Sequence, residues 1–284
     1  MITLKSGGLS ARLCAPGEYY LGTRFDRAGV FRKIEKDGYV FADEWFTGSA
    51  PDTHDHVCGL SGEFVTVDFG SVPPGGLFCK VGVGLLRRPD EAAYDWFRLY
   101  EIADPGRWSV EAGESEVIYR HILEGWYSYS RRIVLSEGCR IDIFHELSWH
   151  SGAPLEGFYY NHNFLTFGGL PVGPVRSLLF PWSPDGDWRS DYDNVAFSRN
   201  GIQFSDTVKP GTSVYCGNIH NPSGPTSCRF VLSDGERSVS VEGDRPLHRL
   251  VFWANEKVAC PEPYIPIRAS LGDTLSWHLS YTFR

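Results

Sequence analysis

An alternation of apolar and polar residues with a period of two is the feature that most constrains how this chain can fold. From Arg140 to Trp149, for example, Ile141, Ile143 and Leu147 lie at odd-numbered positions, and most residues between them are polar. Successive side chains of a β-strand point to opposite faces, so this pattern predicts a strand with one buried face. The same pattern recurs along the chain, in segments 64–69, 78–86, 116–123, 127–135, 158–167, 213–219, 229–232, 238–241, 247–253 and 276–283.

Composition also favours β-structure over helices. Of the 284 residues, only Asp90 to Tyr100 looks weakly helical, and 31 glycines and 18 prolines provide turns between many short strands. Aromatic residues make up 14% of the chain, which favours β-sheets and ligands with sugar-like or aromatic surfaces. No repeat or low-complexity linker divides the sequence. We therefore predict an all-β fold, a large antiparallel β-sandwich that forms a single domain over residues 1–284.

Turn-forming residues predict several local structures. Leu4 to Tyr20 is typical of a hairpin that turns at Ala15–Gly17, and the Asp37–Gly38 pair predicts a turn between two strands within Arg24 to Phe41. The acidic segment from Asp185 to Asp193 has the oxygen density of a calcium loop but lacks the glycine and closing glutamate of an EF-hand. It is predicted to be an acidic surface loop.

Charge and cysteine content narrow the possible partners. The formal net charge is -8, with 27 Lys and Arg against 35 Asp and Glu, so neither nucleic acid nor an anionic membrane is expected to bind. No stretch reaches the roughly 18 apolar residues of a membrane span, and the N-terminus lacks a signal-peptide pattern. The seven cysteines form no CxxC pair and are interpreted as reduced. A cytoplasmic protein is the simplest expectation.

The segment from Tyr159 to Gly168 contains the first candidate for chemistry. His162 lies between Asn161 and Asn163, with aromatic residues on either side of them. Amides bond hydroxyl groups and aromatic rings cover C–H surfaces, so this environment suits a polar, ring-shaped ligand. If the chain is an enzyme, His162 is the first candidate for proton transfer. A hydrogen-bonded structural histidine is the alternative.

A second group of histidines raises the question of a metal site. His54 and His56 are two residues apart and would share one face of a strand, and Glu63 follows them. This order faintly resembles the first cupin motif, in which two histidines and a glutamate hold a metal. Glu63 is too far along the chain, and the histidine of the second cupin motif is missing. A solvated loop or a contact to a sugar hydroxyl is therefore favoured over a metal site.

Glu262 is the second candidate for proton transfer. It lies between Pro261 and Pro263, in a segment that follows the strand ending at Trp253. Prolines fix φ and remove backbone donors, so this glutamate is held in a stiff segment, which suits a positioned group. The chain has no GxSxG, Walker or GxGxxG pattern, so nucleophilic serine and nucleotide chemistry are not expected. A sandwich could bring Glu262 and His162 to one site.

These two segments resemble sequences of the galactose mutarotases, or aldose 1-epimerases. The segment Tyr160–Gly169 is similar to their Asn-His-x-Tyr-Phe-Asn-Leu segment, and Cys260–Tyr264 with the final strand is similar to their ending. The segment from Arg24 to Gly38 also resembles their early hairpin, so the match follows the whole chain in order. The resemblance implies the galactose mutarotase-like supersandwich, with His162 as general acid and Glu262 as general base.

By this resemblance the protein is an isomerase that interconverts the α and β anomers of a sugar. One catalytic group removes the proton of the O1 hydroxyl while the other protonates the ring oxygen, so the ring opens and then closes on the other face. No metal or organic cofactor is implied. The implied partner is a monosaccharide or a related small molecule.

The resemblance is weakest in the first half of the chain. The substrate-binding arginine and the second histidine of the family have no counterpart there, and segments that contain Glu63 and Lys80 stand in their places. The predicted substrate-binding residues are Arg24, His56, Glu63, Lys80, Arg88 and Asn161. The sequence leaves open whether the sugar is neutral, phosphorylated or acidic, and whether the chain dimerises.

Two alternatives remain. A non-catalytic carbohydrate-binding protein on the same fold would use aromatic side chains as stacking platforms, and the candidates are Trp45, Trp182, Trp188 and Trp253. A cupin-like metalloenzyme with ligands in the 54–63 segment is the less favoured alternative.

Overall fold

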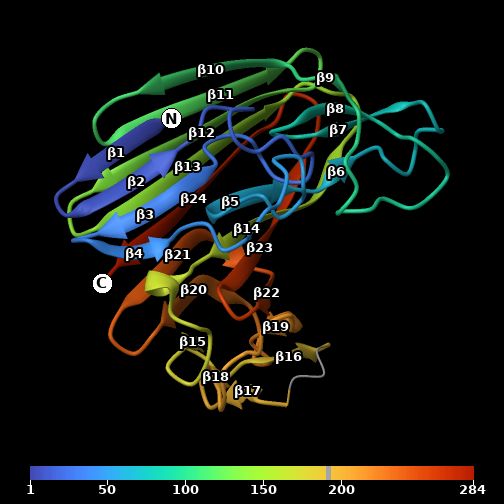
Figure 1. Cartoon of the computed structure of the whole chain (residues 1–284). Helices are drawn as coiled ribbons and strands as arrows, with labels where there is room; N and C mark the ends of the chain where they lie inside the picture. Colours follow the sequence, from blue (N-terminus) through green and yellow to red (C-terminus); the bar gives the residue numbers. More distant parts are fainter. Residues whose placement is uncertain (190–192) are drawn as a thin grey trace.

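The computed structural model describes residues 1–189 and 193–284, and antiparallel strands make up its four sheets. Within these residues the only helical element is the 3-10 turn η1 (Phe167–Gly169), and no helix is long and apolar enough to cross a membrane. The largest sheet has ten strands (Figure 1). In spatial order they are β10 (Arg107–Ala112), β11 (Glu116–Leu123), β12 (Tyr127–Ser136), β13 (Arg140–Trp149), β24 (Thr274–Phe283), β21 (Ser238–Leu247), β20 (Thr226–Ser233), β15 (Ser177–Leu179), β18 (Gly201–Phe204) and β17 (Val195–Ser198).

Three smaller sheets complete the fold. The six-stranded sheet has the order β16 (Asp185–Trp188), β19 (Val214–His220), β22 (Arg249–Ala254), β23 (Ala259–Ala269), β14 (Leu155–Phe164) and β5 (Gly59–Phe64). The N-terminal sheet contains β1 (Ile2–Ser6), β2 (Leu9–Leu13), β3 (Phe31–Lys36) and β4 (Tyr39–Ala42). The last sheet contains β6 (Thr66–Val67), β7 (Leu77–Lys80), β8 (Gly84–Arg87) and β9 (Ile102–Asp104).

The main core lies between the ten-stranded sheet and the sheets that cover it. In β12 the side chains of Tyr127, Tyr129, Ile133 and Leu135 are buried, and the even-numbered residues between them are not. One continuous apolar cluster joins these side chains to residues of the N-terminal sheet and of β14 and β23. The period-two pattern therefore marks the buried face correctly, and the predicted large antiparallel sandwich is confirmed.

Both predicted turns form, but only the turn at Asp37–Gly38 closes a hairpin. Asp37–Gly38 joins β3 to β4 as expected. The first hairpin joins β1 to β2 through Gly7 and Gly8, and Gly7 has a φ of +56°, which glycine adopts without strain. The predicted turn at Ala15–Gly17 instead follows β2, where the Glu18 carboxylate accepts a hydrogen bond from the Ala15 N–H.

The weak helix predicted from Asp90 to Tyr100 is absent. The Asp90 carboxylate accepts a hydrogen bond from the Ala92 N–H, and the Asp95 carboxylate accepts one from the Phe97 N–H. Such local bonds between side chain and backbone compete with helix formation. The segment forms a loop instead, and its aromatic residues reach the candidate site.

The acidic segment from Asp185 to Asp193 is a loop only in part. Asp185–Trp188 forms the edge strand β16 and pairs with β19, while residues 190–192 lie outside the described residues. An edge strand can keep polar side chains in solvent, so its acidic composition did not reveal the strand.

Candidate active site

Strand register brings the two candidate catalytic residues together on one face of the six-stranded sheet. On β14, Tyr160, His162 and Phe164 are two residues apart and share this face. The pairing of β14 with β23 places Tyr160 opposite Tyr264. Two residues further along the same antiparallel alignment, His162 lies beside Glu262, although 100 residues separate them in the sequence (262 - 162).

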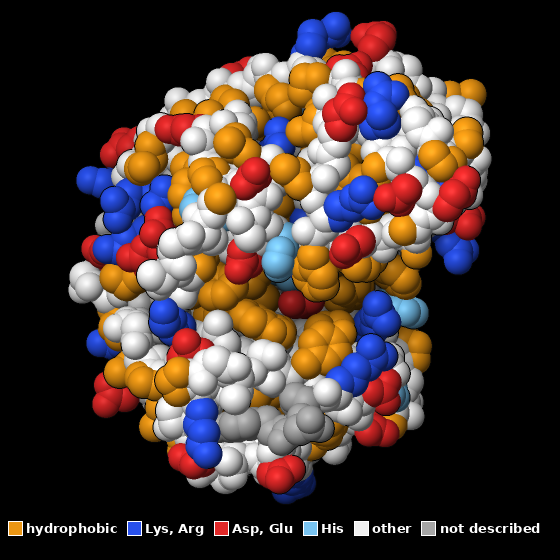
Figure 2. Space-filling model, turned by 45° about the vertical axis from the view of Figure 1, so that its right-hand side comes forward, with side chains coloured by type: hydrophobic (Ala, Val, Ile, Leu, Met, Phe, Trp, Pro, Cys, Tyr) orange, Lys and Arg blue, Asp and Glu red, His pale blue; other side chains and the backbone are white. Residues whose placement is uncertain are grey.

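A cavity of about 760 Å³ lies over this face. Figure 2 shows the hollow, with orange hydrophobic side chains gathered around it. A volume of this size, with aromatic walls and a few polar groups, is typical of a small-molecule site. The lining side chains are Arg24, Phe25, Trp45, His54, Asp55, Val65, Trp96, Phe97, Phe158, Tyr160, His162, Phe164, Ser213, Tyr215, Arg249, Trp253, Glu262 and Tyr264.

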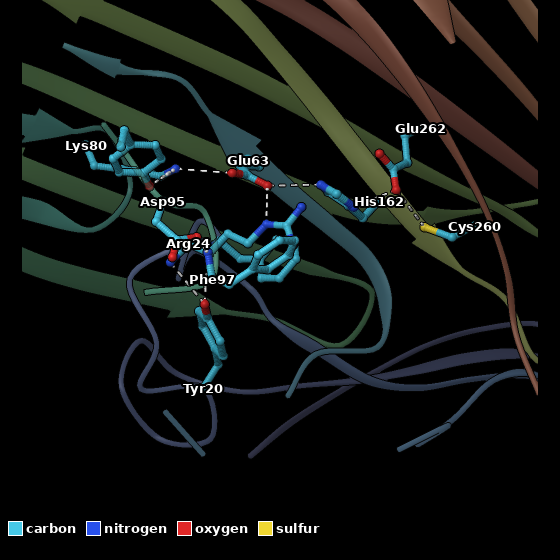
Figure 3. Close-up of polar contacts among 11 residues, drawn as sticks. Tyr20, Arg24, Glu63, Lys80, Asp95, Phe97, His162, Cys260 and Glu262 are labelled. Atoms are coloured by element: carbon cyan, nitrogen blue, oxygen red, sulfur yellow. Dashed lines mark hydrogen bonds and ion pairs between the residues drawn. The ribbon is translucent and has the colours of Figure 1, made fainter. Parts of the chain in front are cut away.

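His162 is held between two carboxylates (Figure 3). Its Nε2 lies 3.0 Å from Oε2 of Glu63, and its Nδ1 lies 3.0 Å from Oε1 of Glu262. Phe25 packs edge-on against the imidazole and Phe164 stacks on it, with centroid distances of 4.8 and 5.7 Å. These contacts fix the orientation of the ring and direct both nitrogens at acceptors.

Glu63 is the centre of a buried charge network. Its Oε2 accepts a hydrogen bond from Arg24 Nε at 2.9 Å, and its Oε1 accepts one from Lys80 Nζ at 3.2 Å. Lys80 also donates to the Tyr94 hydroxyl at 3.1 Å. The side chains of Glu63 and Lys80 are both 0% exposed. One carboxylate therefore compensates two cations and at the same time orients His162.

This network shifts the pKa of each partner. Burial disfavours the charged carboxylate of Glu63, but Arg24 and Lys80 outweigh it and lower the pKa of Glu63. Burial also disfavours a charged His162, but Glu262 and Glu63 outweigh it and raise the pKa of His162. At Lys80 the burial effect dominates and lowers the pKa. An imidazole between two carboxylates is thus favoured in its protonated form, which is a proton donor.

Glu262 presents its carboxylate to the cavity. In the described part of the chain its polar contacts involve Oε1, which faces His162 Nδ1 and lies 3.7 Å from Cys260 Sγ. These contacts leave Oε2 for a ligand. A carboxylate oxygen that faces a cavity beside an imidazolium suits proton abstraction from a bound hydroxyl group.

The same residues offer a conceivable metal-ligand set. Nδ1 of His162, Sγ of Cys260 and a carboxylate oxygen of Glu262 lie within 4.8 Å of one another. Burial, however, raises the pKa of the Cys260 thiol, whereas a metal binds the thiolate. The raised pKa of His162 likewise keeps a proton on the ring. Without a bound cation, these protonation states suit acid-base chemistry.

Three of the residues predicted for the site line the cavity, namely Arg24, His162 and Glu262. Glu63 and Lys80 lie behind them and contact Arg24 and His162, or each other, within a fully buried layer. Both residues thus support the cavity wall, and their direct contact with a sugar stays a prediction.

Two predicted ligand-binding residues lie elsewhere. Asn161 is on the other face of β14 from His162, because side chains alternate along a strand, and its amide donates to the Tyr281 hydroxyl at 2.8 Å. Arg88 donates to the backbone carbonyl oxygens of Phe69 and Val72. Neither side chain is part of the cavity lining, so this cavity does not support their predicted contact with a sugar.

His54 and His56, the histidines considered for a metal site, have different surroundings. His56 Nδ1 lies 2.8 Å from Ser49 Oγ, and its ring packs between aromatic side chains away from the cavity wall. His54 packs against Phe97. Among the described residues, His54, His56 and Glu63 do not form a set of ligand atoms, so the cupin-like hypothesis is not supported.

Asp55 and Arg249 are cavity residues that sequence reasoning missed. Asp55 Oδ1 and Arg249 Nε are buried and have no hydrogen-bond partner among the described residues. The only sequence signal for Asp55 was its place between two histidines. Arg249 becomes conspicuous only through strand pairing, which places it opposite Tyr264. Of the four tryptophans considered as stacking platforms, Trp45 and Trp253 line the cavity.

No protein-family model and no curated protein matches the sequence. Solved structures, in contrast, match the entire chain. A galactose mutarotase-like protein from Lactobacillus casei has a TM-score of 0.56 at 12% identity, with 100% of both chains covered. The fold is that of the galactose mutarotases.

Two further structures support this assignment of the mutarotase-like fold. A galactose mutarotase-like protein from Clostridium acetobutylicum has a TM-score of 0.56 at 14% identity, covering 99% of this chain and 94% of its own. An aldose epimerase homologue from C. elegans has a TM-score of 0.53 at 13% identity, covering 100% and 98%. The predicted supersandwich is therefore confirmed, and at these identities the likeness concerns the fold.

Proposed function

We propose that the protein is a cofactor-independent aldose 1-epimerase that interconverts the α and β anomers of a sugar. The observation that carries this proposal is the pairing of His162 Nδ1 with Glu262 Oε1 at 3.0 Å on the floor of the cavity. Anomer exchange needs one group that removes a proton and another that supplies one, and this pair provides both beside a space for a sugar.

In the proposed mechanism, the Glu262 carboxylate accepts the proton of the O1 hydroxyl. His162, protonated at rest, donates the Nδ1 proton to the ring oxygen, so that the C1–O5 bond breaks and C1 becomes an aldehyde. Rotation about C1–C2 presents the other face of the aldehyde. The ring oxygen then attacks C1 and returns its proton to His162, while Glu262 returns its proton to O1. A bound sugar replaces the hydrogen bond that joins the two groups at rest.

The cavity wall supplies groups suited to holding the ring. The Asp55 carboxylate lines the cavity as a hydrogen-bond acceptor suited to a sugar hydroxyl. Trp45 and Trp253 offer aromatic faces for the C–H surface of the ring, and their centroids are 5.4 Å apart. Glu63, held by Lys80 and Arg24, is the proposed positioning residue that keeps His162 protonated and in place.

Exchange between the anomers of glucose and galactose, followed by NMR, tests the proposal. We expect acceleration by the native protein and a loss of about 100- to 10,000-fold with Glu262→Gln or His162→Asn, because each change removes one proton-transfer group. Glu156→Gln is a matched control, since Glu156 is an exposed residue of β14. Unchanged exchange rates in both site variants, with any aldose that the native protein accelerates, would refute the mechanism.

A carbohydrate-binding protein without turnover is the second candidate. It is favoured by one observation: both nitrogens of His162 already have carboxylate partners. If neither could be displaced, the imidazole would have no proton to give to a sugar. This candidate predicts saturable sugar binding, weakened by Trp253→Ala, with anomer exchange no faster than in buffer.

We further propose that residues 1–284 act as one domain and that the partner is a monosaccharide or a sugar derivative. A cytoplasmic location is also proposed, and it is supported by the seven free cysteines.

A further inference from the structure

Arg249 is a cation of the cavity wall without a counter-charge in the described part of the chain. It begins β22, and its guanidinium carbon lies 4.6 Å from the ring centre of Tyr264 and 5.8 Å from that of Phe158. Its Nε is buried and has no acceptor among the described residues. The aromatic rings hold the guanidinium in place and satisfy none of its hydrogen-bond donors.

The other arginine of the cavity differs from Arg249 in this respect. Arg24 Nε lies 2.9 Å from the Glu63 carboxylate, which compensates its charge. Glu262, the acidic neighbour of Arg249 on the sheet, is itself bonded to His162, whose pKa is raised. Asp55, the other acid of the wall, comes from a separate loop segment. Of the two arginines that line the cavity, Arg249 is therefore the one without an ion pair among the described residues.

Strand register sets the position of Arg249 relative to the proposed catalytic pair. Arg249 is opposite Tyr264 and Val251 is opposite Glu262, so Arg249 and Glu262 are diagonal neighbours on adjacent strands. Such neighbours are separated by about 7 to 8 Å between Cα atoms. A sugar whose anomeric carbon lies at Glu262 would thus direct a substituent from the far side of the ring toward Arg249.

We infer that Arg249 forms a subsite for an anionic group on the sugar, remote from the anomeric carbon. A guanidinium presents its N–H donors in a planar fork that matches a phosphate or a carboxylate, so the substrate class is an aldose phosphate or a uronic acid. The anion site is inferred from the surroundings of Arg249. The orientation of the sugar ring, in contrast, rests on the proposed epimerase function.

Calorimetric titration with methyl glycosides tests the subsite separately from turnover, because a methyl group at O1 prevents ring opening. The probes are methyl glucoside, methyl glucoside 6-phosphate and methyl glucuronide, with the same three compounds in the galacto series. We expect at least one charged glycoside to bind about 10- to 100-fold more tightly than its neutral counterpart. Preference for the phosphate or for the carboxylate identifies the source of the charge.

Arg249→Gln should abolish this preference, and Arg249→Lys should retain part of it, because lysine keeps the charge and loses the fork. Arg268→Gln is the control for net charge, since Arg268 is an exposed residue of β23 outside the cavity wall, and it should keep the full preference. If Arg249→Gln fails to fold, the comparison of Arg249→Lys with the native protein still decides the matter.

Equal affinities for charged and neutral glycosides in the native protein would overturn the inference, and so would a preference unchanged in both Arg249 variants. These failures are distinct from failure of the proposed function, which is measured by exchange of the free sugars. Exchange without charge preference refutes the Arg249 subsite alone. Charge preference without anomer exchange of the matching free aldose phosphate or uronic acid supports the subsite and refutes the epimerase function.

Discussion

Replacing Glu63 with Gln should destabilise the folded protein by about 3 to 5 kcal/mol, the usual cost of removing one partner from a buried ion pair. Glu63 accepts hydrogen bonds from Arg24, Lys80 and His162 at distances of 2.9 to 3.2 Å, and glutamine keeps the shape but not the charge. Most of this loss of stability should come from Lys80, which is 0% exposed and would remain as an uncompensated buried cation. Arg24 is 17% exposed and should contribute less.

Urea unfolding of Glu63→Gln, Lys80→Met and the double variant measures this effect. In the double variant the uncompensated Lys80 charge is gone, so its loss of stability should be smaller than the sum of the single losses by about 0.5 to 3 kcal/mol. Strictly additive losses, or a loss below about 1 kcal/mol in Glu63→Gln, would refute the view that the carboxylate and the ammonium compensate each other.

The pH dependence gives an independent check of the same variant. Because the pKa of Glu63 is lowered in the folded protein, its stabilising effect is fully present above its ordinary pKa of 4.5 and is lost as the pH falls toward the folded value. The stability difference between the native protein and Glu63→Gln should therefore shrink as the pH falls below 4.5. Above that range it also contains the loss of the Glu63 contribution to the raised pKa of His162. A difference that grew on acidification below pH 4.5 would contradict this assignment.

Two further predictions concern His162 and the strand that carries Glu63. The pKa of His162 is raised, so its stabilising charge should be fully present below its ordinary pKa of 6.5 and be lost as the pH rises through the folded value. Urea unfolding at several pH values should thus show the largest cost of His162→Asn below pH 6.5, and a cost that increases toward alkaline pH would be inconsistent with a charged imidazole. Gly59→Ala should cost roughly 2 to 5 kcal/mol, because Gly59 has a φ of +65° and a methyl group there would lie 2.6 Å from Phe31 Cβ. Gly138→Ala, with a φ of +76° and open space, should cost only about 1 to 2 kcal/mol, and equal thermal or urea stability of the two variants would exclude the steric contribution.

Much of the fold could be predicted from local patterns. The alternation from Arg140 to Trp149 predicts β13 with its buried face, and Asp37–Gly38 marks a turn that the chain forms. The prediction failed where a local pattern was misleading. Asp90 and Asp95 bond to the backbone of their own segment and prevent a helix, which composition alone did not show.

The candidate site was predictable only in part. His162 and Glu262 were recognised from their neighbours and from a family resemblance, and the structure places them in contact. Asn161 is adjacent to His162 in sequence, yet it faces the opposite side of the strand and bonds to Tyr281. Adjacency in the sequence therefore indicated the segment that lines the cavity, but the alternation of side chains along the strand places His162 in the cavity and Asn161 on the other face.

What the sequence by itself determined is the position of the long alternating strands, their buried faces and the chemical nature of the two candidate catalytic groups, because these depend on local periodicity and residue type. Only the tertiary structure decided which charges meet. Glu63, Lys80 and Arg24 form one buried network, because strand register and loop packing bring together residues that are far apart in the chain. Arg249 lies opposite Tyr264 and has no ion pair among the residues that the structure describes. The Coulomb interactions that set the pKa of His162 depend on those distances, which no local pattern contains.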